Sequence, residues 1–241
     1  MIKELLTELK KVYGAKGIKI ELYSERLTEE EWKFLKLTAD ELSMFISIKT
    51  AGAEDERGIF QAVNIGAQNI VVPMTESSYA LSKFISLVKK QSSDINIFAN
   101  IETINGYKNI DEILKTCSKN IEGIVFGRND FCSSLGLTSK DINSETVFEY
   151  AKELSQKAKI HNLKFYAGGN VCRESVPFFS KLPYLTGYET RKIIFDAPVL
   201  NGISAGAINK ALDFELLWLQ SKHQDKFDFA RIEVLKERFL C

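Results

Sequence analysis

The stretch "INIFANIETINGYKNIDEILKTC", residues 95–117, joins two kinds of local pattern. Its first half is rich in isoleucine and apolar throughout most of its length, which is typical of a strand buried on both faces of a parallel sheet. Its second half has apolar residues at helical spacing. Glu102 lies between the two halves, and the pattern leaves two interpretations of its carboxylate. It either caps the helix expected at 106–117 or is a reactive group at the end of a strand.

The same strand-then-helix pattern recurs along the chain at intervals of roughly 25 to 30 residues. Strands are predicted at 17–24, 44–50, 69–74, 95–102, 121–127 and 163–169, with a further strand within 184–195. Helices are predicted at 27–42, 54–66, 77–91, 106–117, 144–162 and 172–182. Thr28 and Glu31 form a predicted capping box at the start of the first helix, and Gly66 is expected to end the second.

This alternation implies parallel strands joined by right-handed crossovers, in either a closed barrel or an open doubly wound sheet. The chain has 241 residues, which suits a TIM-type (β/α)8 barrel of about 250 residues. We therefore expect such a barrel over residues 1–206, with one strand short or degenerate. Residues 207–241 are helical in pattern and are expected to form an extension that either caps the barrel or mediates oligomerisation.

Composition narrows the classes of partner. Lysine and arginine total 32, as do aspartate and glutamate. The sequence therefore lacks the excess of basic residues that would predict a nucleic-acid partner. It also lacks a run of about 18 apolar residues, which would predict a membrane-spanning helix. The first residues lack the apolar segment of a signal peptide. The four cysteines show no CxxC pairing and are expected to be reduced thiols of a cytoplasmic protein.

Polar residues follow the apolar strands at the end where sites form in parallel α/β proteins. Glu102 and Asp130 lie one strand–helix unit apart, so their carboxylates should face the same barrel opening. Two close carboxylates repel each other unless a cation lies between them. Oxygen ligands favour Mg²⁺ or Mn²⁺, and the alternative is that each carboxylate caps a local turn.

Three segments in the same order resemble the HpcH/HpaI aldolase/citrate lyase family: "IVVPMTES" (70–77), "NIETINGYKNIDEI" (100–113) and "IEGIVFGRNDFCSSLG" (121–136). With the flanking units, the resemblance covers roughly residues 17–195. It implies a TIM barrel that binds Mg²⁺ or a similar ion. It also implies the making or breaking of carbon–carbon bonds beside a metal-bound enolate. By motif match, Glu102 and Asp130 are the metal ligands.

Two departures from the family pattern bear on catalysis. Lys49, in "ISIKT", stands where the family has an arginine, and is expected to stabilise the enolate oxygen unless it reaches into solvent. The family's pyruvate aldolases also use a histidine near the first strands, and none is present there. A proton shuttle would then be a carboxylate, a lysine or a metal-bound water. Glu21 is the leading candidate by position, although it could equally balance Lys49 as an ion pair.

Substrate contacts are expected from two strand ends. In "GRND", Gly127, Arg128 and Asn129 are candidates, with Arg128 either meeting a substrate carboxylate or lying on the surface. In "AGGN", Gly169 and Asn170 could present backbone amides to an anion, or could simply form a tight turn. Glu189 and Arg191 are two residues apart and share one face if their segment is a strand. A structural ion pair between layers is favoured for them over a role in the site.

The sequence thus predicts a divalent-metal-dependent carbon–carbon lyase, of aldolase or citrate-lyase type. It would act through the enolate of a small 2-oxo acid or acyl compound. Its substrate would be an oxo acid, a hydroxyacyl compound or a sugar-like acid. One rival is another enolate enzyme of the same superfamily, a hydrolase or transferase. The second is a non-catalytic family member with a role in assembly. The resemblance also implies a homo-oligomer, a trimer or hexamer, and leaves open whether the substrate is a coenzyme A thioester.

Overall fold

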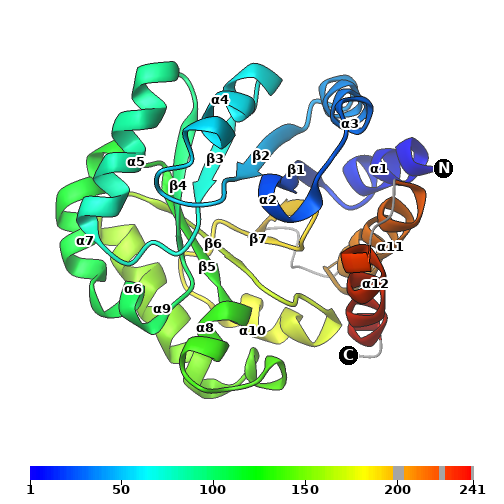
Figure 1. The fold of residues 1–241 in the computed structure, drawn as a ribbon. Coiled ribbons are helices and arrows are strands. Elements are labelled where there is room, and N and C mark those ends of the chain that lie inside the picture. Colours follow the sequence, from blue (N-terminus) through cyan, green and yellow to red (C-terminus); the bar gives the residue numbers. More distant parts are fainter. Residues whose placement is uncertain (198–203, 223–225, 240–241) are drawn as a thin grey trace.

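The computed structural model describes residues 1–197, 204–222 and 226–239, and its centre is a closed barrel of eight strands in chain order (Figure 1). The strands are β1 (Ala15–Glu21), β2 (Phe45–Lys49), β3 (Asn69–Val72), β4 (Asn96–Ile101), β5 (Gly123–Gly127), β6 (Lys164–Gly168), β7 (Gly187–Glu189) and β8 (Ile193–Asp196). This confirms the predicted TIM-type barrel and excludes the open doubly wound sheet.

The helices of the described residues surround the barrel (Figure 1). They are α1 (Ile2–Lys11), α2 (Leu22–Glu25), α3 (Glu29–Glu41), α4 (Glu56–Ile65), α5 (Ser78–Gln91), α6 (Ile104–Lys108), α7 (Ile110–Cys117), α8 (Arg128–Ser134), α9 (Glu145–Ile160), α10 (Val176–Lys181), α11 (Ser204–Ser221) and α12 (Lys226–Phe239). Their apolar faces and the outward faces of the strands form one hydrophobic core. On the opposite faces of β3, β4 and β5, Val71, Phe98 and Val125 form a second, smaller apolar cluster inside the barrel. The charged strand ends are left for a site.

The last two strands depart from the (β/α)8 pattern. Strands β1 to β7 pair in parallel, whereas β8 is antiparallel to both β7 and β1. The single strand predicted within 184–195 is in fact a hairpin, with residues 190–192 as its turn. A connection of three residues can only join antiparallel strands, because a crossover between parallel strands needs about a dozen residues or more. The degenerate strand that the sequence predicted is therefore β8.

Local signals in the sequence explain where several helices begin and end. The capping box at the start of α3 is confirmed, with Thr28 accepting from the Glu31 N–H and Glu31 accepting from the Thr28 N–H. Gly66 ends α4 with φ of 73°, a conformation that glycine adopts without strain. The predicted helix 106–117 is two shorter helices, α6 and α7, which meet at Asn109.

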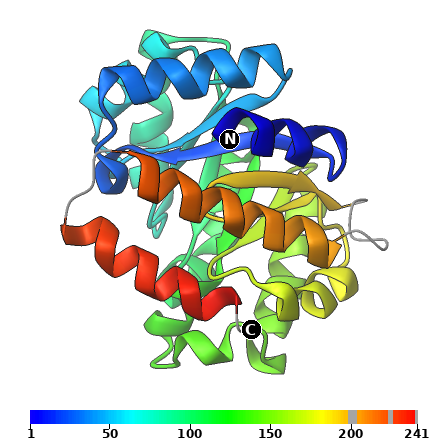
Figure 2. The same ribbon diagram turned by 90° about the vertical axis from the view of Figure 1, so that its right-hand side faces the viewer.

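The C-terminal residues form two helices on one flank of the barrel. Figure 2 shows α11 running beside α1, with α12 next to it. Residues of α12 line the cavity at the barrel opening. Arg238 on α12 donates to the Val171 carbonyl and pairs with Glu215 on α11 at 3.2 Å. The extension thus closes part of the opening in this chain; a role in oligomerisation stays a prediction.

Two further expectations concern cysteines and membranes. Cys117 and Cys132 are buried free thiols, as predicted. Cys172 is disulfide-bonded, contrary to the expectation of a reduced thiol, and Cys241 lies outside the described residues. None of the helices in the described part of the chain has the length and apolar character needed to cross a membrane.

Candidate active site

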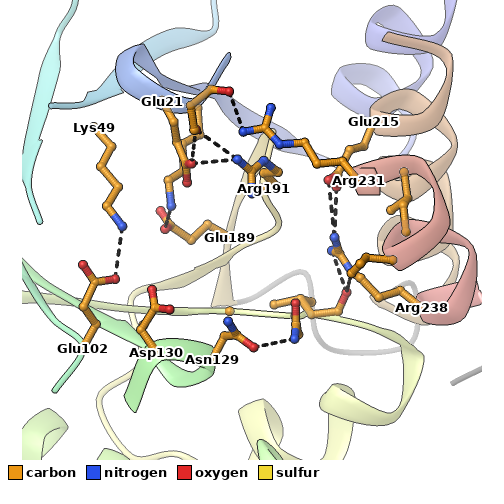
Figure 3. Close-up of a pocket in the computed structure, with 18 of the residues that line it drawn as sticks. Glu21, Lys49, Glu102, Asn129, Asp130, Glu189, Arg191, Glu215, Arg231 and Arg238 are labelled. Carbon is orange, nitrogen blue, oxygen red and sulfur yellow. Dashed lines mark hydrogen bonds and ion pairs between the residues drawn. The ribbon is translucent and has the colours of Figure 1, made fainter. Parts of the chain in front are cut away.

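A cavity of about 580 Å³ opens where the C-terminal ends of the parallel strands meet (Figure 3). All of the predicted site residues except Arg128 line it. Their proximity follows from the fold, because the strands are parallel and in register and therefore end at the same rim. Charged side chains make up much of its lining, which also includes the apolar residues Val171, Val234 and Leu235.

Glu102 directly follows β4 and is 2% exposed. Its Oε1 accepts from the Met74 N–H at 3.0 Å, and its Oε2 accepts from Asn100 Nδ2 at 2.7 Å and from Lys49 Nζ at 3.1 Å. The cap of α6 is the neighbouring Thr103, whose hydroxyl accepts from the Gly106 N–H. Glu102 therefore does not cap the helix, and its carboxylate is held at the cavity wall.

Asp130 lies in the first turn of α8, on the next unit of the barrel, and also lines the cavity. Within the described part of the chain, it has no hydrogen bond or ion pair to satisfy its carboxylate. Burial raises the pKa of Glu102, and the charge of Asp130 raises it further, against the opposing effect of Lys49. Two carboxylates with one lysine leave this end of the cavity short of positive charge.

This arrangement fits a divalent cation. Glu102 Oε1 accepts a single hydrogen bond, and Asp130 is unpaired within the described residues, so both have lone pairs to offer. Asn100 Oδ1 is buried nearby and has no hydrogen-bond partner among the described residues. The described chain contains no group of three or more His, Cys, Asp or Glu that could hold a metal. Two carboxylates would leave the remaining positions to water and substrate, which is how Mg²⁺ is usually bound.

Lys49, the last residue of β2, points into the cavity toward Glu102 (Figure 3). Its side chain is 16% exposed, so it does not simply reach into solvent, which was the alternative interpretation. Its ammonium group is thus beside the carboxylate predicted to bind the metal. The structure brings together the cation and the two carboxylates that the sequence assigned to one site.

Glu21 ends β1 and pairs with Arg191 Nη2 at 2.9 Å, while also accepting from the Ser24 hydroxyl. Burial alone would raise the pKa of Glu21, but Arg191, Lys19 and Lys49 outweigh that effect and hold it at about 2. A carboxylate with so low a pKa is a weak proton acceptor near neutral pH. The geometry therefore favours the ion-pair interpretation over the general base, with Arg191 as the partner in place of Lys49.

Arg128 was predicted to contact substrate, and the structure contradicts this. It is fully buried, away from the cavity, and donates to the carbonyls of Gly168 and Gly169. Its guanidinium also stacks against Phe178 and Phe179, at 4.8 and 4.5 Å from the ring centroids. Arg128 therefore fixes the end of β6, and neither interpretation made from the sequence, substrate contact or surface residue, describes it.

The other predicted contact residues do line the cavity. Asn170 Nδ2 donates to Asn129 Oδ1 at 2.6 Å, which joins the ends of β5 and β6. Gly127 leaves space for Glu102, since a Cβ there would lie 2.8 Å from Glu102 Oε2. Gly169 has φ of 86°, and a Cβ would lie 2.5 Å from the Asn129 nitrogen. Both glycines are thus required by close approach.

Glu189 and Arg191 do not pair with each other, and each forms an ion pair with a residue of another element. Glu189 lies inside the barrel and pairs with Lys19, a residue that the sequence analysis did not select, whereas Arg191 reaches Glu21. The sequence analysis also missed Asn100. This residue lies on β4 two positions before Glu102, and in a strand such a spacing places two side chains on the same side, so it could have been predicted to line the cavity. Arg231 and Arg238 on α12 line the cavity as well, and no local pattern indicated it.

The fold and the site together define a TIM-type barrel with a paired-carboxylate centre at the C-terminal ends of its strands. A sequence model of the HpcH/HpaI aldolase/citrate lyase family matches residues 46–169. These residues include Lys49, Glu102 and Asp130. The chain belongs to the HpcH/HpaI aldolase/citrate lyase family.

Solved structures show the same fold at low sequence identity. An HpcH/HpaI aldolase from Desulfitobacterium hafniense is 14% identical, with 88% of this chain and 89% of that chain covered and a TM-score of 0.63. A citrate synthase variant, SbnG, is 17% identical, with 90% and 89% covered and a TM-score of 0.62. A family protein from Burkholderia cenocepacia is 12% identical, with 88% and 89% covered and a TM-score of 0.64. No curated protein matches the chain.

Proposed function

We propose that this protein is a divalent-metal-dependent carbon–carbon lyase, of aldolase or citrate-lyase type, acting on a small 2-oxo acid or acyl compound. The observation that carries the proposal is the meeting of Glu102, Asp130 and Lys49 in one cavity. The family membership supports it, because the matched region contains all three residues.

Glu102 and Asp130 would hold the metal, with Mg²⁺ or Mn²⁺ favoured by all-oxygen ligands. The bound ion would act as a Lewis acid toward the oxo group of the substrate and stabilise negative charge on its oxygen. Lys49 would add a second positive charge on the same side, as a fixed group that stabilises charge developing in the transition state. Asn100 holds Glu102 in place through a 2.7 Å hydrogen bond.

The remaining residues of the site form the wall of the cavity. Gly127 and Gly169 let the backbone approach closely, and the Asn129–Asn170 hydrogen bond orders the ends of β5 and β6. Helix α12 covers part of the opening and would limit the access of water. Glu21 stays ionised and paired with Arg191, so it would fix the position of Arg191 instead of taking a proton.

Calorimetric titration of Mn²⁺ and Mg²⁺ into the wild type and Asp130→Asn tests the metal site. We expect the wild type to bind and the variant to lose at least tenfold in affinity, since one of two protein ligands is weakened. Asp111→Asn is the matched control, because it makes the same change at a side chain that is 80% exposed. Equal binding by the wild type and Asp130→Asn would overturn the assignment.

Deuterium exchange at the methyl group of pyruvate tests the chemistry. The proposal requires exchange that depends on added metal and disappears in Asp130→Asn. Exchange that proceeds equally in the presence of a chelator would refute a metal-dependent enolate. Metal binding without exchange on any 2-oxo acid or thioester would favour the non-catalytic alternative.

A further inference from the structure

The cavity has a second charged end, formed where α12 meets α2 and the segment that follows β6. Figure 3 shows Arg231 and Arg238 on the side opposite Lys49, Glu102 and Asp130, with Arg191 between the two groups. The proposed function uses only the first end. The second end therefore raises the question of what part of a substrate it would contact.

The two arginines nearest the middle of the cavity have unused donors. Arg191 binds Glu21 and Ser24 through Nη2 alone, so its Nε and Nη1 donate to no described residue. Arg231 donates through Nη2 to the Ser24 carbonyl. Its Nη1 is buried and forms an ion pair with Asp228 at 3.5 Å, which leaves Nε as the donor without a partner among the described residues. A guanidinium donor left without an acceptor at the cavity can bind an anionic group of a ligand.

The arginines also repel each other. Burial lowers the pKa of Arg231, and the neighbouring charge of Arg191 lowers it further. Arg238, by contrast, is fully engaged: it donates to the Val171 carbonyl and pairs with Glu215, and so fastens α12 in place. Both guanidinium groups are paired with a carboxylate, but donors without a partner among the described residues remain on Arg191 and Arg231.

The balance of charges around the whole cavity also favours an anionic ligand. Its described lining holds six cationic side chains, namely Lys19, Arg26, Lys49, Arg191, Arg231 and Arg238, against five carboxylates, namely Glu21, Glu102, Asp130, Glu189 and Glu215. Asp228, which pairs with Arg231 directly behind the lining, brings this balance to zero before any divalent ion is added. A bound divalent ion would then leave an excess of positive charge in a partly desolvated site, which a dianion would offset more fully than a substrate with one carboxylate.

We infer that Arg191 and Arg231 form an anion subsite that binds a second acidic group of the substrate, a carboxylate or a phosphate, at the end remote from the 2-oxo acid. This inference rests on the proposed function for the position of the 2-oxo acid. The cavity of about 580 Å³ has room for such an extended dianion. Arg231 comes from α12, so the C-terminal helix is a determinant of substrate choice as well as a cover.

Matched ligands test the inference without any mutation. The dissociation constants of 2-oxoglutarate and 2-oxopentanoate, measured by calorimetry with Mg²⁺ present, compare chains that differ in the terminal carboxylate alone. The pair 2-oxoadipate and 2-oxohexanoate repeats the comparison one carbon longer. We expect the dianion to bind at least tenfold more tightly in one or both pairs. Equal affinities within both pairs would overturn the inference.

Variants on α12 then locate the effect. Arg231→Gln should reduce the preference for the dianion to about threefold or less while leaving the affinity for 2-oxopentanoate unchanged. Val234→Glu, at a cavity-lining position that is 55% exposed, should weaken dianion binding in the same selective way. Lys236→Gln is the matched control, since it removes a charge from the same helix outside the cavity lining. Equal weakening of both ligands by Arg231→Gln would refute the subsite.

Phosphonopyruvate and acetyl-CoA distinguish the sources of the second charge. Arg231-dependent binding of the phosphonate identifies a phosphate-type group, and Arg231-dependent binding of the dicarboxylates identifies a carboxylate. Arg231-dependent binding of the thioester alone, with none of the small dianions, would overturn the inference.

Failure of the inference and failure of the proposed function have different signatures. Metal-dependent exchange on pyruvate without any preference for dianions would leave the function and remove the subsite. Succinate bound more tightly than butyrate through Arg231, together with unchanged Mn²⁺ affinity in Asp130→Asn, would leave the subsite and remove the metal-dependent function.

Discussion

Lys49 and Glu102 meet at 3.1 Å across the opening of the barrel, one from the end of β2 and the other from the end of β4. The pair brings a cation to a carboxylate that is otherwise buried and desolvated. It also places Lys49 next to the proposed metal position.

Lys49→Ala should retain metal binding and lose catalysis. Glu102 and Asp130 remain in place, so the affinity for Mn²⁺ should change by less than about threefold. Exchange at the methyl group of pyruvate should fall by about 10²-fold or more, the usual effect of losing one group that stabilises an oxyanion. Lys49→Arg, which restores the charge with a planar donor, should recover part of the rate. An unchanged rate in Lys49→Ala would remove Lys49 from the site.

Glu21 should link stability to pH. Its pKa of about 2 in the folded protein lies below the ordinary value of 4.5, so its contribution is present above pH 4.5 and is lost as the pH falls toward 2. A shift of this size corresponds to about 3 kcal/mol. The difference in free energy of unfolding between wild type and Glu21→Gln should therefore shrink between pH 5 and pH 3, as measured by urea denaturation. Glu30→Gln, at an exposed glutamate, serves as the control.

Arg128 should prove to be structural. Arg128→Lys keeps a charge but loses the fork that reaches two carbonyls and the stacking on Phe178 and Phe179. We expect the free energy of unfolding to fall by about 2–4 kcal/mol. The dissociation constant for 2-oxo acids, measured below the melting transition, should change by less than about threefold. A large loss of affinity with unchanged stability would restore the substrate-binding role predicted from the sequence.

The Lys19–Glu189 pair inside the barrel should be strongly coupled. Both side chains are nearly inaccessible, at 9% and 5% exposed, so removing one partner leaves the other charged and buried. Lys19→Met or Glu189→Gln alone should cost about 3–5 kcal/mol. The double variant should cost less than the sum, because no unpaired charge remains, and a double-mutant cycle measures the coupling. Additive losses would show that the two residues do not depend on each other.

Much of the fold could be predicted because hydrophobic period and capping residues are local properties of a sequence. The alternation of strands and helices, the capping box at Thr28 and the end of α4 at Gly66 all belong to this class. The hairpin of β7 and β8 could not be predicted in this way, because "YLTGYETRKIIF" has no strong turn signal. Its three-residue turn becomes evident only when both strands pair in the barrel.

The two charged residues of "GRND", Arg128 and Asp130, show which part of the site could not be predicted from the sequence. Arg128 and Asp130 are two residues apart and were assigned to one site, but both lie in α8. Residues two apart on a helix point in nearly opposite directions, at about 200°. Asp130 therefore faces the cavity while Arg128 faces the core beside Phe178. The motif identified the right segment, and the helix decided which side chain reaches the site.

The sequence by itself determined the class of barrel, the strand ends that carry charge and the family, since these depend on patterns of neighbouring residues. Only the tertiary structure decided which charges meet. Lys49 reaches Glu102, Glu21 reaches Arg191, and Lys19 reaches Glu189 across separations of 53 to 170 residues. Arg231 reaches the cavity from α12 because the C-terminal helices fold back along the flank of the barrel. Such pairings arise from the closure of the barrel, which no local pattern encodes.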